Sequence, residues 1–172
     1  MGAGGGVNTA SIQIAKLAGA GTIYVVGSNA EKCARAKELG ADITINRETY
    51  PNWSKELYKL TEKQGVDVVV DNVGQATLTD SIRSARVGGR ILVVGATSGP
   101  KPEIDVRQIF ARQISIIGST MGPHRDYVSV MNLLFAKRLK AVIGDVLPLQ
   151  EARQAQAKLE NFETFGKVVL EL

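Results

Sequence analysis

Short apolar runs rich in valine and isoleucine alternate along the chain with amphipathic stretches. The apolar runs close on turn residues and predict strands at residues 22–27, 41–46, 66–74, 89–97 and 114–120. The amphipathic stretches predict helices at residues 8–18, 30–39, 54–64, 76–86 and 106–112. Nearly continuous apolar strands separated by helices are typical of a parallel sheet that is covered on both faces. The pattern therefore predicts an α/β fold with a doubly wound, Rossmann-like parallel sheet.

A glycine-rich turn, "GAGGGV" at residues 2–7, leads directly into the first predicted helix. Without β-carbons, the backbone N–H groups of such a turn converge on a diphosphate at the helix start, where the helix dipole also favours negative charge. Candidate phosphate-binding residues are Gly4, Gly5, Gly6 and Val7. Asn8 stands where the dinucleotide-binding fingerprint has its third glycine, and we expect its side-chain oxygen to cap the helix.

The strand that should deliver this turn is missing, because only Met1 precedes Gly2. A dinucleotide-binding sheet has six strands in the order 3-2-1-4-5-6, so the absent strand is the central one. We expect a sheet truncated at its first strand. Its second and fourth strands either pair directly or accept a strand from another copy, such as the tail "GKVVLEL".

The residues after the 22–27 strand bear on the choice of cofactor. An NAD-preferring site usually carries Asp or Glu there, to bond the ribose 2′-hydroxyl. This chain has Gly27, Ser28 and Asn29 instead, with Lys32 and Arg47 as candidate cations for a 2′-phosphate. We therefore predict that NADP(H) is favoured and that NAD(H) remains possible. The alternative interpretation is that both cations are ordinary solvated charges.

Composition narrows the remaining classes of function. The net charge of +4 is spread along the chain, which does not favour a nucleic-acid surface. Cys33 is the only cysteine and His124 the only histidine, so we expect no zinc site in this chain. No apolar run reaches the length of a membrane span, and no signal-peptide pattern is present. We expect a cytoplasmic protein that has no contact with membranes.

Several segments together resemble the cofactor domain of the medium-chain dehydrogenase/reductase family, which includes zinc-type alcohol dehydrogenases and zinc-free quinone oxidoreductases. They are "GAGGGVNTASIQIAKLAGA", "VGSNAEKCARAKELGAD", "GVDVVVDNVG", "GGRILVVGATSG", "QISIIGSTMG" and "FGKVVLEL". The resemblance implies further cofactor contacts at Asn72, Val73, Gly74, Gly95, Ala96 and Thr97. For the glycines, plain turn chemistry is the alternative.

The same resemblance divides the chain into a dinucleotide-binding domain, 1–120, and a helix and strand segment, 121–172. Family members pack the second segment on an N-terminal catalytic domain to which nothing here corresponds. The tail's apolar residues are therefore expected to be buried in some other way or exposed. Relatives commonly dimerise through their sixth strands, so we expect a homo-oligomer, with a dimer through residues 114–120.

The resemblance implies hydride transfer between a nicotinamide cofactor and an alcohol, carbonyl or quinone in the intact parent enzyme. No catalytic residue can be assigned: Asp67 and Asp71 suggest structural roles, His124 suggests a helix start, and Cys33 a small core residue. We therefore expect the isolated chain to be inactive. The alternative is a shortened, catalytically inactive binding or assembly module.

Overall fold

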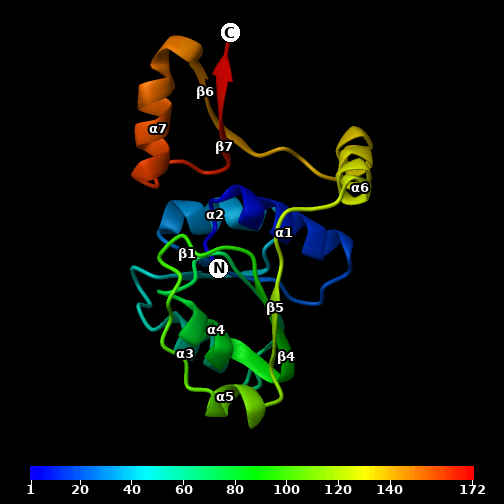
Figure 1. The fold of residues 1–172 in the computed structure, drawn as a ribbon, viewed down its shortest axis with the longest axis vertical. Coiled ribbons are helices and arrows are strands. Elements are labelled where there is room, and N and C mark those ends of the chain that lie inside the picture. The colour runs from blue at the N-terminus through cyan, green and yellow to red at the C-terminus, as the bar shows by residue number, and fades with distance from the viewer.

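The structure is a computed structural model that describes residues 1–172, and its first 120 residues alternate strands with helices (Figure 1). The strands are β1 (Tyr24–Gly27), β2 (Ile43–Asn46), β3 (Val66–Asp71), β4 (Ala85–Val93) and β5 (Ser115–Gly118). The helices are α1 (Gly6–Leu17), α2 (Ala30–Glu38), α3 (Trp53–Leu60), α4 (Leu78–Ser84) and α5 (Arg107–Phe110). All strand pairings are parallel, which confirms the predicted α/β fold.

The sheet is divided into two pieces. β2 and β1 form one pair, and β3, β4 and β5 form a separate three-stranded sheet in that order. This is the order predicted from the sequence with its central strand absent. The expectation that the flanking strands pair directly is wrong, because β1 bonds only β2 and β3 bonds only β4. The tail strand does not insert within its own chain, since it pairs elsewhere.

Two element boundaries differ from those predicted, each for a local reason. β3 ends at Asp71 rather than at residue 74, because the Asp71 carboxylate accepts the N–H groups of Val73 and Gly74 and turns the chain. α4 ends at Ser84 because Ala85 adopts an extended conformation with ψ of 144°, so β4 begins four residues earlier than expected.

The hydrophobic core is divided in the same way as the sheet. Two clusters belong to the β1–β2 half: one centres on Ile12, Val25 and Ala36, the other on Ile45, Trp53 and Leu57. A third cluster belongs to the β3–β5 half and includes Val69, Ile82 and Ile91. Each half-sheet is therefore stabilised mainly by its own helices.

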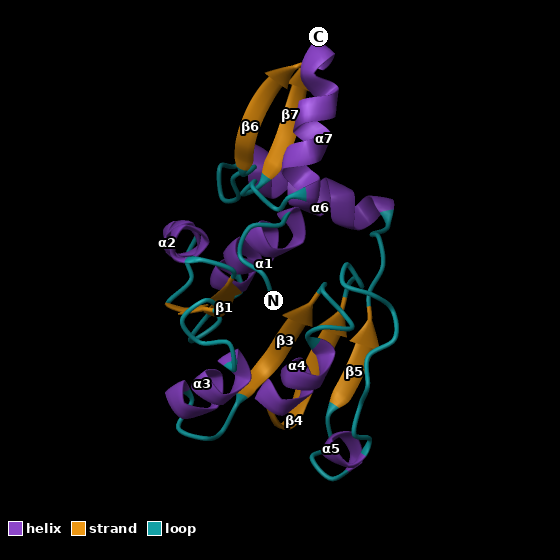
Figure 2. Ribbon diagram, turned by 90° about the vertical axis from the view of Figure 1, so that its left-hand side faces the viewer, coloured by secondary structure: helices purple, strands orange, loops and turns teal.

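The tail projects from this body as a small unit of its own (Figures 1 and 2). It contains α6 (His124–Phe135), β6 (Ile143–Pro148), the 3₁₀ turn η1 (Leu149–Glu151), α7 (Ala152–Glu160) and β7 (Lys167–Glu171). β6 pairs with β7 in parallel. His124 is the first residue of α6, as the sequence indicated.

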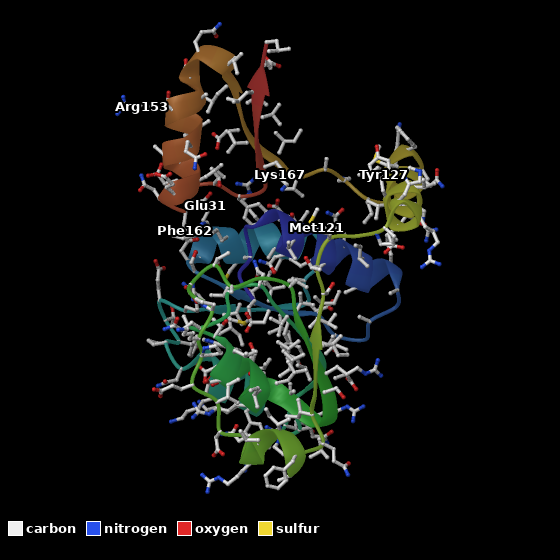
Figure 3. All side chains as sticks on the ribbon, in the orientation of Figure 1. Glu31, Met121, Tyr127, Arg153, Phe162 and Lys167 are labelled. Atoms are coloured by element: carbon white, nitrogen blue, oxygen red, sulfur yellow. The ribbon has the colours of Figure 1, made fainter.

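Many apolar side chains of the tail are exposed rather than buried. Met121 is 96 % exposed, Phe135 and Phe162 are each 75 % exposed, and Tyr127 is 61 % exposed. Figure 3 labels Met121, Tyr127 and Phe162. Of the two outcomes expected for these apolar residues, burial elsewhere or exposure, exposure is therefore the one observed. None of the helices combines the length and apolar character that crossing a membrane requires.

Candidate cofactor site

The glycine turn delivers α1 with an open amino end. Gly5 is the N-cap residue, no side chain caps the helix, and the first turn holds no acidic residue. The first N–H groups of the helix are therefore left for an external anion. The expected capping role of Asn8 is wrong: Asn8 lies inside the first turn, and its side-chain amide donates to Asn72 Oδ1 at 3.3 Å.

The tail approaches this turn closely at Gly4. A β-carbon on Gly4 would lie 3.2 Å from the Thr164 carbonyl oxygen, and Gly166 N–H donates to the Gly4 carbonyl at 2.7 Å. Phe165 is buried in the same cluster as Ala3 of the turn. The Arg35 guanidinium also lies 4.3 Å from the centre of the Phe165 ring. The turn is therefore held from outside by residues far along the chain.

Lys167, which the sequence analysis did not select, belongs to this site. A β-carbon on Gly6 would lie 2.7 Å from Lys167 Cε and 2.8 Å from its Nζ, so the ammonium group stands at the amino end of α1 (Figure 3). A cation and the positive end of a helix dipole repel each other. An anion bound near both would be attracted to both, so this arrangement favours an anionic group such as a phosphate.

The residues predicted for a 2′-phosphate are only partly brought together. Arg47 N–H donates to the Gly27 carbonyl at 3.0 Å, which places Arg47 beside Ser28 at the carboxyl ends of β1 and β2. Asn29 caps α2, its side chain accepting from Lys32 N–H at 2.8 Å. The Lys32 ammonium instead donates to the Phe162 carbonyl of the tail. The Arg47 backbone is thus brought beside Ser28, whereas the Lys32 ammonium is bonded to the tail.

A buried carboxylate organises the loop after β3. Asp71 is fully buried and accepts from Val73 and Gly74 N–H groups at 2.9 and 3.0 Å. It also accepts from the Thr77 and Ser81 hydroxyls, at 2.9 and 2.6 Å. These donors satisfy the charge without a cation, and they confirm the structural role expected for Asp71.

The loop after β4 packs directly against the loop after β3. A β-carbon on Gly74, whose φ is +84°, would lie 2.8 Å from Ala96 Cα, and one on Gly95 would lie 3.0 Å from the Asn72 carbonyl oxygen. Thr97 Oγ1 also donates to the Asn72 carbonyl at 3.4 Å. The predicted residues of both loops therefore adjoin one another at the carboxyl ends of neighbouring strands, where open α/β sheets bind ligands.

The other polar residues considered from the sequence lie outside this arrangement. Asp67 has an exposed side chain that pairs with Arg86 at 2.5 Å, and this contact lowers the pKa of Asp67. Cys33 is buried and contacts Gly27 closely, as a small core residue does. No three His, Cys, Asp or Glu side chains gather where they could hold a metal ion. No residue of the chain is thereby identified as catalytic.

The glycine turn at the start of α1, together with the two loops at the carboxyl ends of β3 and β4, is typical of a dinucleotide-binding α/β domain. The sequence profile described as zinc-binding dehydrogenase matches residues 6–136 of the chain. The chain therefore belongs to the zinc-binding dehydrogenase family, within the medium-chain dehydrogenases and reductases that it resembles in sequence.

Individual relatives agree with this assignment. The chain is 34 % identical to the NAD-dependent alcohol dehydrogenase of Saccharolobus solfataricus over 99 % of its own length and 49 % of that protein's. It is 28 % identical to the quinone oxidoreductase of Rattus norvegicus, over 98 % of this chain and 52 % of the other. The chain thus spans about half the length of the curated relatives it matches.

Solved structures show the same likeness. A crystal structure of an NAD-dependent alcohol dehydrogenase matches with a TM-score of 0.93 and 42 % identity, covering all of this chain and 50 % of that one. The 2-octenoyl-CoA carboxylase reductase CinF, solved with NADP and 2-octenoyl-CoA, matches with a TM-score of 0.87 and 27 % identity. The match covers 98 % of this chain and 41 % of CinF. The relatives therefore include both NAD and NADP proteins.

Proposed function

We propose that the chain binds NADP(H) in preference to NAD(H) and forms the cofactor-binding part of an oxidoreductase. The observation that carries dinucleotide binding is the electrostatic site at the amino end of α1, and the preference for NADP(H) rests on Ser28 and Arg47 in place of an acidic residue. At the amino end of α1, uncapped N–H groups and the Lys167 ammonium face the same position and lack an acidic partner in the first turn. A cofactor diphosphate is the anion whose charge and size suit both.

The remaining contacts follow from the strand ends. Gly4, Gly5, Gly6 and Val7 would hold the diphosphate, and Ser28 with Arg47 would hold the 2′-phosphate. The two adjoining loops, residues 72–74 and 95–97, would line the remainder of the dinucleotide. The nicotinamide supplies hydride transfer when it is bound. In the complete enzyme the reaction partner would be an alcohol, a carbonyl compound or a quinone.

Calorimetric titration with NADPH and NADH tests the cofactor preference. We expect tighter binding of NADPH, and Arg47→Ala should remove most of the difference, because a guanidinium beside Ser28 favours a dianionic phosphate. Ser28→Asp should reverse the preference by repelling that phosphate. Lys32→Ala is the matched control, because the Lys32 ammonium is bonded to Phe162. Tighter binding of NADH by the unaltered chain would contradict the proposal.

A second candidate function is a binding or assembly module without turnover. The divided sheet favours this second function, because β1 and β3 each have one edge without a partner strand. Activity assays distinguish an oxidoreductase from a module without turnover. They use the pure chain with NADPH and either quinones or aldehydes, with and without zinc. We expect background rates only, since no substrate-binding residue is identified, whereas robust turnover would exclude the module.

We also infer a homodimer through β5 and a cytoplasmic location. All four β5 residues are exposed, and β5 pairs only with β4, so its outer edge is open to a second copy. The single cysteine, which is buried and unpaired, suits a reducing compartment.

A further inference from the structure

A cavity of about 550 Å³ lies at the amino ends of β3 and β4. Its lining includes Gln64, Arg83 and Arg112, which come shortly before β3, β4 and β5 in the chain, together with side chains of α3. In Figure 2 the arrows of these strands start near α3 and α5 and point away from them. The cavity is therefore on the opposite edge of the sheet from the candidate cofactor site, which lies at the carboxyl ends of the strands. We call this cavity the basic pocket.

Cations dominate the lining of the basic pocket. None of its nine lining residues is acidic, and five are lysine or arginine: Lys55, Lys59, Lys63, Arg83 and Arg112. Lys59 pairs with Glu56 at 3.0 Å, and Arg83 pairs with Asp80 at 3.2 Å. Lys55, Lys63 and Arg112 form no ion pair. Two carboxylates against five cations leave three positive charges uncompensated, and such a cluster attracts anions.

The Arg112 guanidinium is fixed in place by the end of α4. It donates to the Ile82 carbonyl at 3.1 Å and to the Ala85 carbonyl. A long side chain loses rotamer freedom when it binds a ligand, and a side chain that is already held loses less. Arg112 therefore presents a preorganised positive charge at the pocket.

Lys63 is positioned by the way in which α3 ends. Glu62 N–H donates to the Lys59 carbonyl at 3.0 Å, which turns the chain back on the helix. Lys63 N–H donates to the Tyr58 carbonyl at 2.7 Å. Glu62 and Lys63 have φ of +51° and +67°, a region that favours glycine and that other residues keep only where surrounding contacts hold them. These contacts keep Lys63 beside the α3 residues that line the pocket.

The charge and volume of the pocket indicate the class of ligand. A phosphate group carries a charge of about −1.5 to −2 at pH 7, so one phosphate leaves part of the positive charge uncompensated and two compensate it fully. A volume of about 550 Å³ lies within the range of about 300 to 1,000 Å³ that is usual for small-molecule sites. The positive charges gather in one concave site rather than along a stripe, which favours a compact polyanion over a nucleic acid.

We propose that the basic pocket binds a small molecule that carries two or more phosphate groups, at a site separate from the dinucleotide. Lys55, Lys63 and Arg112 bind the phosphates by charge-assisted hydrogen bonds. Tyr58 and Val87, the two hydrophobic residues of the lining, contact the remainder of the ligand. This binding does not depend on the proposed cofactor function, because the two sites occupy opposite edges of the sheet.

The test titrates the full chain with inorganic pyrophosphate and follows the backbone amide signals by NMR. We expect saturable shifts at residues 55–64 and 83–87. Lys55→Glu combined with Lys63→Glu should raise the pyrophosphate dissociation constant reported by residues 83–87 at least tenfold, because two attractive charges become repulsive. Shifts at residues 4–8 report separately on the glycine turn, so the two sites are distinguished within one titration.

The matched control is Lys137→Glu combined with Lys140→Glu, two exposed lysines of the tail that change the net charge by the same amount. It should alter the dissociation constant less than twofold, and thermal melts verify that both double variants fold. Absence of saturable shifts at residues 55–64 and 83–87 would overturn the proposal, as would equal weakening by the control. Inorganic phosphate that binds as tightly as pyrophosphate would contradict the need for two phosphates. Tighter binding of an oligoribonucleotide by the same residues would assign the pocket to a nucleic acid instead.

Discussion

The two sides of the candidate cofactor site are built in different ways. On the β3–β4 side, the Asp71 carboxylate and close glycine contacts hold two loops against each other through residues near in sequence. On the α1 side, the glycine turn is held by the distant tail, through Gly166, and by the buried amine of Met1. One side is therefore preorganised by its own loop, whereas the other depends on long-range partners.

This difference bears on how binding energy is distributed. A loop held by its own residues loses little conformational freedom when a ligand arrives, whereas a turn held by distant residues depends on those contacts being formed. We therefore expect a change at Asp71 to alter folding strongly, a change in the charge of Met1 to alter folding less, and a change at Lys167 on the α1 side to alter ligand affinity. The following three predictions test this distinction.

The largest effect is expected at Asp71. Asp71→Ala leaves two hydroxyls and two backbone N–H groups without their acceptor in a buried site, and should lower the free energy of unfolding by about 3 to 5 kcal/mol. Urea denaturation measures this loss, and Asp71→Asn, which keeps one acceptor oxygen, should lose less. Asp67→Asn is the control, because its exposed ion pair should contribute less than about 1 kcal/mol. A loss below that value for Asp71→Ala would contradict the preorganised loop.

A smaller effect is expected from the Met1 amine as pH changes. Its pKa is lowered from 8.0 to about 6 on folding, so between these values the unfolded chain binds more protons, and stability rises with pH. The rise from pH 6 to pH 8 should be about 2 kcal/mol. Acetylation of Met1 should abolish it. The lowered pKa values of Asp42, Asp67 and Asp105 act at acidic pH, outside this window. A flat profile for the unacetylated chain would show that the amine is solvated.

The smallest effect is expected at Lys167. Lys167→Ala should weaken NADPH binding about fivefold to tenfold, which corresponds to about 1 kcal/mol for one exposed phosphate contact. The free energy of unfolding should not fall, because a cation is removed from the positive end of α1. Calorimetry measures the NADPH affinity, and denaturation of the same sample measures the free energy of unfolding. Lys137→Ala, at an exposed lysine of the tail, should change neither, and equal weakening by both variants would assign the loss to net charge alone.

The sequence predicts the helices, the strands and their order well, but it predicts the contacts between distant side chains poorly. The strand and helix patterns are confirmed because they depend on local periodicity. The sequence also predicts the gap in the sheet, because no strand precedes the glycine turn. The proximity of Arg47 to Ser28 follows from parallel pairing of two predicted strands. These features need only local patterns and general rules of sheet topology.

Other features required contacts that no local pattern encodes. Lys167 lies against Gly6, although the two residues are near opposite ends of the sequence. The only feature of the sequence that could have indicated Lys167 is that a lysine follows a glycine in the tail. Asn8 was assigned a capping role from its residue type, but the side chain of Asn72 competes for it. The Lys32 ammonium donates to a carbonyl of the tail, and its role at a phosphate stays a prediction. In each case a distant residue competes with a local preference.

The single tryptophan of the chain is placed to report on the gap in the sheet. Trp53 is 4 % exposed and packs with Val26, Ile45 and Leu57. It also lines the cavity between β1 and β3. Its indole emission depends on how much water reaches that wall, and no second indole adds background. Dye-free fluorescence measurements can therefore report directly on whether water reaches this wall.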